Sequence, residues 1–138
     1  MPYPRLLLVV CLLLWSASLM APAVQVTGGP SLRGIDLLQQ GFSGWRHGVY
    51  AWYANPLLFI AVIFCWFRYD RWALAAGTLG ILLALTSFWA GETARLAGTT
   101  VPDFAYQWGF YLWIGAQVIV LLLAFQCFIV KWLGLDRK

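Results

Sequence analysis

Apolar residues fall in four long runs, and the shorter segments between them hold most of the charged side chains. A helix needs roughly 20 apolar residues to cross a hydrocarbon layer about 30 Å thick, and each run approaches or reaches that length. The pattern predicts a single all-α integral membrane domain, with four transmembrane helices in an antiparallel bundle. The expected crossings are residues 6–22, 52–67, 72–90 and 108–130.

The first run has two interpretations. Arg5 precedes a short apolar stretch that ends at Ala21-Pro22-Ala23, an arrangement typical of a signal peptide with a small-residue cleavage site. Sixteen apolar residues with interfacial flanks also come close to a membrane span. We favour a retained helix, and cleavage of residues 6–22 stays open as the alternative.

The segment 24–49 lies between the first two crossings and reads as an external loop. Gly28, Gly29 and Pro30 interrupt it, and Ser31 is a suitable helix N-cap. The apolar residues that follow gather on one side of a helix ending near Gly41. We expect a short amphipathic helix that lies along the outer headgroup layer.

The second crossing starts at an Asn-Pro step. Asn55 suits an N-cap and Pro56 the first helical position. A helix from Pro56 to Phe67 would nevertheless be only about 18 Å long. We therefore favour an entry in two parts, with an earlier turn before Asn55, and an interfacial capping role for Asn55 itself.

Small and polar residues inside the runs indicate how the helices pack. Ala76, Gly80 and Ala84 recur every four residues, a spacing that lets membrane helices approach closely. We expect them to form the central packing seam. Amides in hydrocarbon need hydrogen-bond partners, so such side chains should face the bundle or a second copy of the chain. The candidate polar membrane positions are Asn55, Thr78, Gln117 and Gln126.

Composition and charge agree with this topology. Hydrophobic residues make up 62% of the chain and charged residues 10%, against about 25% charged residues in soluble domains. Positive charge collects on the cytoplasmic side of membrane proteins, which predicts a multi-pass protein of the plasma membrane with both termini in the cytoplasm. On that side would lie Asp70, Asp136 and six cations, namely Arg5, Arg68, Arg71, Lys131, Arg137 and Lys138.

Candidate chemistry is sparse. The four runs contain no Asp, Glu, Lys, Arg or His, which weighs against a proton pump or an ion exchanger. The single histidine, His47, has no accompanying catalytic motif. The three cysteines lack the spacing of a metal site or a disulfide framework. We expect no enzyme, metal or cofactor, and the scattered cations argue against nucleic acid binding.

A small bundle without catalytic groups points to function through contact, with membrane lipids and a protein partner. Aromatic and charged residues at the outer face are good contact anchors. The candidate external contact surface is Trp45, Arg46, His47, Glu92, Arg95 and Asp103.

Three functions fit this description. The first is an accessory subunit of a membrane complex, or a homo-oligomer. The second is an immunity protein that inhibits a membrane-acting toxin. The third is a channel or small-molecule carrier, which would need a polar cavity lined by Asn55, Thr78, Thr86, Gln117 and Gln126.

The step Trp52-Tyr53-Ala54-Asn55-Pro56, preceded by the segment GFSGWRHGVY, resembles a group of small bacterial inner-membrane proteins of unknown function. The resemblance covers roughly Leu37 to Trp72. It implies the same four-helix architecture and no particular activity.

Overall fold

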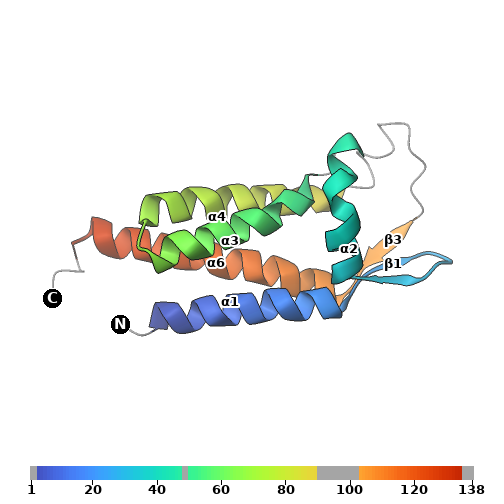
Figure 1. Cartoon of the computed structure of the whole chain (residues 1–138), viewed down its shortest axis with the longest axis horizontal. Helices are drawn as coiled ribbons and strands as arrows, with labels where there is room; N and C mark the ends of the chain where they lie inside the picture. The colour runs from blue at the N-terminus through green and yellow to red at the C-terminus, as the bar shows by residue number, and fades with distance from the viewer. Residues whose placement is uncertain (1–2, 48–49, 90–102, 135–138) are drawn as a thin grey trace.

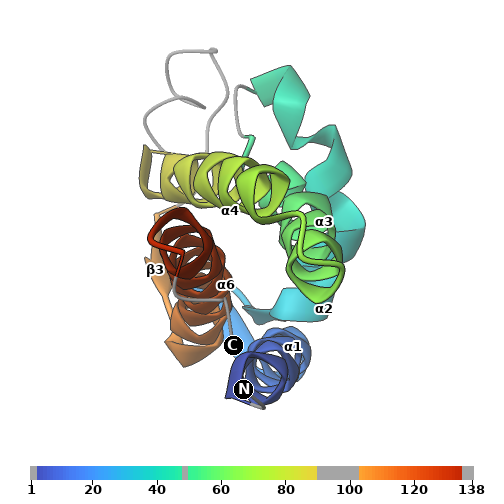
Figure 2. The ribbon, with the colours of Figure 1, turned by 90° about the vertical axis from the view of Figure 1, so that its left-hand side faces the viewer.

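The computed structural model describes residues 3–47, 50–89 and 103–134, and four long helices lie side by side along its long axis (Figure 1). Around that axis their order is α1, α6, α4 and α3 (Figure 2). The first residues of α1 and the last of α6 lie at one end, here called the terminal end (Figure 1). The helices are α1 (Tyr3–Met20), α3 (Ala54–Trp66), α4 (Asp70–Leu85) and α6 (Trp108–Trp132).

The opposite end, here called the cap end, carries a small sheet and the short helix α2 (Figure 1). The strands pair antiparallel in the order β2-β1-β3, with Val24 opposite both Leu32 and Tyr106. The sheet thus joins the two loops that sequence analysis treated separately, and the all-α prediction was wrong on this point. The elements are β1 (Pro22–Val26), β2 (Ser31–Arg33), β3 (Phe104–Tyr106), α2 (Gly34–Gln40) and the 3-10 helix η1 (Gly41–His47).

The start of α2 corrects the predicted N-cap. Ser31 belongs to β2, and the helix begins only at Gly34. The Asp36 carboxylate accepts a hydrogen bond from the Arg33 backbone N–H at 2.8 Å, which satisfies a donor at the helix entrance. Gly34 packs against the end of α1, where a Cβ atom would lie 2.2 Å from the Ser18 carbonyl oxygen. A side chain at this position would push the cap away from α1.

The two-part entry into the second long helix is confirmed. The 3-10 helix η2 (Ala51–Tyr53) leads directly into α3. Asn55 is the second residue of α3 and does not act as its N-cap, because the helix already begins at Ala54. The expected capping role of Asn55 was therefore wrong, and its side chain is free to bridge between helices.

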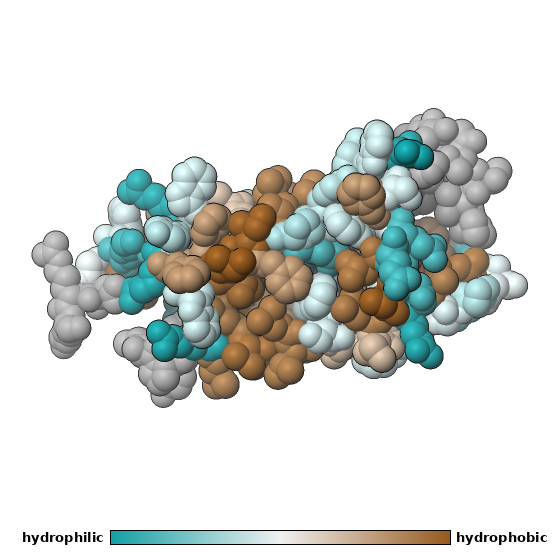
Figure 3. Space-filling model, viewed as in Figure 1, coloured by the Kyte–Doolittle hydropathy of each residue, from teal (hydrophilic) through white to brown (hydrophobic). Residues whose placement is uncertain are grey.

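Within the described ranges, two helical stretches are long and apolar enough to cross a membrane, Asp70–Trp89 and Trp108–Trp132. The first joins α4 to the 3-10 helix η3 (Thr86–Trp89). In their most apolar windows, 33% and 28% of the residues, respectively, are buried in the molecule. On the face seen in Figure 3, apolar side chains cover most of the middle of the long axis, and hydrophilic patches lie toward both ends.

The half of the bundle toward the terminal end is closely packed, and we call it the packed region. Its buried side chains come from all four long helices and are mostly small or branched. They are Leu8, Cys11, Leu58, Ala61, Val62, Cys65, Ala73, Ala76, Ala116, Val120, Leu123 and Ala124.

The predicted seam residues Ala76, Gly80 and Ala84 are all buried on α4. A Cβ atom at Gly80 would lie 3.2 Å from Gln117 Oε1 on α6 and 3.5 Å from Leu57 Cβ on α3. This face of α4 therefore contacts both neighbouring helices, as close helix packing with small residues requires.

Candidate functional site

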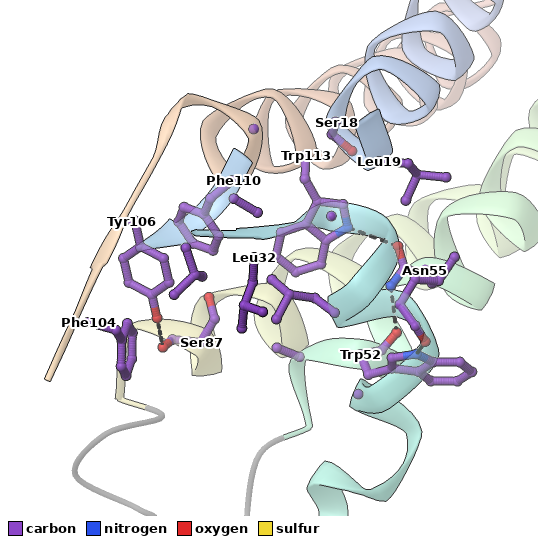
Figure 4. Close-up of a pocket in the computed structure, with 18 of the residues that line it drawn as sticks. Ser18, Leu19, Leu32, Trp52, Asn55, Ser87, Phe104, Tyr106, Phe110 and Trp113 are labelled. Atoms are coloured by element: carbon purple, nitrogen blue, oxygen red, sulfur yellow. Dashed lines mark hydrogen bonds between the residues drawn. The ribbon is translucent and has the colours of Figure 1, made fainter. Parts of the chain in front are cut away.

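The cap end contains a partly open cavity of about 420 Å³, here called the chamber (Figure 4). The sheet and α2 cover it, and the adjoining ends of α1, α3 and α6, with residues of η1, η2 and η3, complete its walls. Its volume falls in the range of about 300–1,000 Å³ that is typical of small-molecule sites. The chamber is the candidate site because its walls bring together residues from every described element except α4.

One wall of the chamber is aromatic. Tyr106 on β3 stacks on Phe110 of α6 with ring centroids 3.9 Å apart, and Phe110 lies 5.8 Å from the Trp113 ring. The Tyr106 hydroxyl donates a hydrogen bond to the Ser87 carbonyl at the end of α4 (Figure 4). Burial raises the pKa of Tyr106, partly opposed by this hydrogen bond. The hydroxyl therefore stays protonated as a donor, and it ties the sheet to α4.

The wall nearest α2 is held by Trp52. Its indole Nε1 donates to the Leu38 carbonyl oxygen at 2.6 Å, and its ring packs edge-on against Phe42 at 5.4 Å. Trp52 is half-buried and lines the chamber.

Asn55 forms the floor of the chamber and connects three helices (Figure 4). Its Oδ1 accepts hydrogen bonds from Trp15 Nε1 of α1 and from Trp113 Nε1 of α6, both at 2.9 Å. Its Nδ2 donates to the Trp52 carbonyl oxygen at 3.0 Å. A single carboxamide thus fixes the two indoles and holds α1, α3 and α6 at a set separation.

Gln117 lies one turn further along α6 from Trp113 and is fully buried. Its Nε2 donates to the Ala54 carbonyl oxygen at 3.0 Å, while its Oε1 has no hydrogen-bond partner. Gln117 therefore bonds to Ala54, the residue immediately before Asn55 at the start of α3. Together with Trp15 and Trp113 the two amides form a polar layer between the chamber and the packed region.

The remaining polar side chains of the chamber are bonded to the chain itself. Ser18 Oγ donates to the Trp15 carbonyl and Ser87 Oγ to the Ala84 carbonyl, each at 2.6 Å. Among the described residues that line the chamber none is charged. The described ranges also hold no group of three or more potential metal ligands.

The other predicted polar positions lie elsewhere. Thr78 and Gln126 are exposed on the outer faces of α4 and α6, and Thr86, the first residue of η3, donates to the Leu83 carbonyl of α4. The structure therefore does not bring together the five side chains expected to line a polar carrier cavity. Asn55 lines the chamber, and Gln117 lies in the layer beneath it.

The predicted external contact surface is only partly described. Trp45 and Arg46 are exposed on η1, with the Arg46 guanidinium 5.6 Å from the centre of the Trp45 ring. Asp103 is exposed beside β3, and its carbonyl accepts from the Thr27 N–H at 2.8 Å. Glu92, Arg95 and the side chain of His47 lie outside the described part of the structure.

Sequence reasoning missed the aromatic partners of the site. The usable signal was that Trp15 and Trp113 are indole donors within apolar runs, and that the sequence assigned no hydrogen-bond partner to the Asn55 amide. Asp70, for which the sequence predicted only the cytoplasmic side, is 3% exposed at the start of α4, and its Oδ2 lies 3.2 Å from Lys131 Nζ.

Comparisons with known protein families, curated proteins and solved structures found no match to this chain. The site combines an apolar wall, polar groups already paired within the chain, and no charged side chain in the described lining.

Proposed function

We propose that this chain is a four-span protein of the bacterial inner membrane that acts as an accessory subunit through contacts within the membrane. The exposed lateral faces of its helices support four crossings. Each of the four long helices presents an apolar side chain that is at least half exposed, namely Leu13, Ile63, Leu82 and Leu122. The 18 residues of α1 span about 27 Å, close to the thickness of a hydrocarbon core. The shortest of the four helices is α3, with 13 residues, and η2 extends it directly at its N-terminal end.

The distribution of charge and tryptophan supports cytoplasmic termini. Arg5, Arg71 and Lys131 are exposed at the terminal end. The Arg5 guanidinium lies 5.3 Å from the centre of the Trp66 ring, which places a cation and an indole at the same level. Basic residues favour the cytoplasmic face, and indoles favour the interface. The terminal end is therefore the cytoplasmic end in this proposal.

Gln126 is the observation that carries the accessory role. It is exposed on α6 beside the exposed Leu122 and Phe125, and it makes no hydrogen bond within the described ranges. An amide facing lipid loses its hydrogen bonds, whereas a neighbouring helix can restore them. Gln126 lies six residues before Trp132, about 9 Å along the helix axis toward the cap end. In this proposal it therefore lies deeper in the membrane than the interfacial indole of Trp132.

The test places a photoactivatable amino acid at position 126 of the full chain in its native membrane, with position 79 of α4 as the matched exposed control. We expect a discrete adduct with another membrane polypeptide from position 126 and none from position 79. Co-purification of that polypeptide in mild detergent should be lost in Gln126→Leu.

Two results would overturn the accessory role. Labelling of lipid alone from position 126 would mean that this face has no protein partner. An adduct between two copies of the chain, with no other polypeptide, would replace the accessory subunit by a homo-oligomer.

A further inference from the structure

We infer that the chamber binds one uncharged hydrocarbon chain of a membrane lipid. This inference concerns the cap end and goes beyond the accessory role proposed for the outer face of α6. It shares with that proposal only the placement of the helices in the membrane.

Hydrogen bonding within the wall determines the class of ligand. The Asn55 carbonyl oxygen already accepts from two indoles, and the hydroxyls of Ser18, Ser87 and Tyr106 each donate to a backbone carbonyl. A polar headgroup would find few free partners on this wall, and a charged one would lack a counter-ion among the described lining residues. An apolar ligand loses nothing in such a site and gains contact with the aromatic wall.

The position of the chamber determines where this ligand comes from. The floor is formed by Asn55 and Trp113, which belong to the helices that enter the bilayer, and the roof by the sheet and α2 (Figures 1 and 4). The chamber therefore lies where the outer leaflet changes from headgroups to hydrocarbon. Lipid chains are the most concentrated apolar molecules at that depth.

The size and shape of the chamber favour a single chain. A volume of about 420 Å³ is at the low end of the range for ligand sites. Leu32 points into the middle of the space from β2, opposite Trp113 (Figure 4). A slender chain can pass between these side chains, whereas a whole lipid with its headgroup would not be enclosed.

The test uses the full chain purified in mild detergent and a palmitic acid analogue that carries an aliphatic diazirine near its methyl end. After illumination, labelled positions are mapped by mass spectrometry. We expect saturable labelling of the peptide around Phe110 and Trp113, or of the peptide around Trp52. Unlabelled palmitic acid and a short polyprenol are the two competitors, and the better competitor identifies the source as acyl or isoprenyl chains.

The variant Leu32→Trp fills the centre of the chamber, and Leu82→Trp on the exposed face of α4 is its matched control. Leu32→Trp should reduce chamber labelling at least tenfold while the control leaves it unchanged. Ala51→Leu fills another wall position and replaces Leu32→Trp if that variant does not elute as a folded species.

The inference is wrong if labelling of these peptides is not saturable, if neither competitor reduces it, or if both filling variants retain it. Saturable labelling confined to the outer faces of the helices would equally overturn it. None of these results bears on the adduct from position 126, so the two proposals fail independently.

Discussion

The two halves of the molecule solve the packing of the same four helices in opposite ways. In the packed region, small residues such as Ala73, Ala116 and Ala124 are completely buried, and the helices meet directly. At the cap end the helices are separated by large rings, including Phe110 and Trp113, and the space between them is the chamber. Small side chains bring backbones together, whereas aromatic side chains hold them apart and leave a cavity.

This difference assigns stability to the packed region and the candidate site to the chamber. Close contacts in the packed region stabilise the bundle, because every buried atom there touches neighbours on several sides. Residues that face the chamber lack neighbours on one side, so their removal should cost less. The polar layer of Asn55 and Gln117 marks the boundary, and each of the predictions below tests one part of this division.

The largest expected effect is the loss of a side chain from the packed region. Leu58 is fully buried, so Leu58→Ala should lower the free energy of unfolding by about 2–5 kcal/mol. The matched change Leu32→Ala in the chamber wall should cost less than about 1 kcal/mol, because that side chain is only partly buried. Both values are measured by titrating the folded chain with SDS in mixed micelles. Equal losses would show that the two halves are packed alike.

The second effect concerns the boundary. Asn55→Leu leaves the indole N–H groups of Trp15 and Trp113 without their acceptor. We expect a loss of about 1–3 kcal/mol, since a buried donor that loses its acceptor is left without a hydrogen bond. In the double variant Trp15→Phe, Trp113→Phe, which lacks both donors, the same change should cost markedly less. The interpretation of Asn55 as a hub fails if the cost is unchanged in that background.

The sequence predicts the packed region better than the chamber, and the reason is physical. Four-residue spacing of Ala76, Gly80 and Ala84 is a local signal, and these residues are indeed buried. Hydrophobic runs likewise located the helices, and helix length alone anticipated the turn before α3. These features depend on neighbours along the chain.

The chamber depends instead on contacts between distant segments. Strands β2 and β3 have only three residues each, too few for an alternating pattern to stand out. The pairing of Val24 with Tyr106 and the bond from Trp113 to Asn55 join positions 82 and 58 residues apart, respectively. A single sequence shows that an amide lies in an apolar run, but it does not show which indoles reach it.

The smallest effect compares two helical glycines. A Cβ atom at Gly115 on α6 would meet nothing within 4 Å, whereas at Gly80 on α4 it would lie 3.2 Å from the buried Gln117 Oε1. Replacing glycine by alanine in a helix stabilises it by about 1 kcal/mol when space allows. Gly115→Ala should therefore raise the free energy of unfolding by up to about 1 kcal/mol.

Gly80→Ala should gain less than Gly115→Ala, or lose stability, because the Gln117 amide is held by its bond to the Ala54 carbonyl and must shift to admit a methyl group. Both free energies of unfolding are measured in the same SDS titration. Because both variants gain the same helix propensity, the difference between them reports the close packing around Gly80. A gain at Gly80 equal to that at Gly115 would mean that the seam tolerates a methyl group there. Close approach of α4 to α6 would then not be what separates the packed region from the chamber.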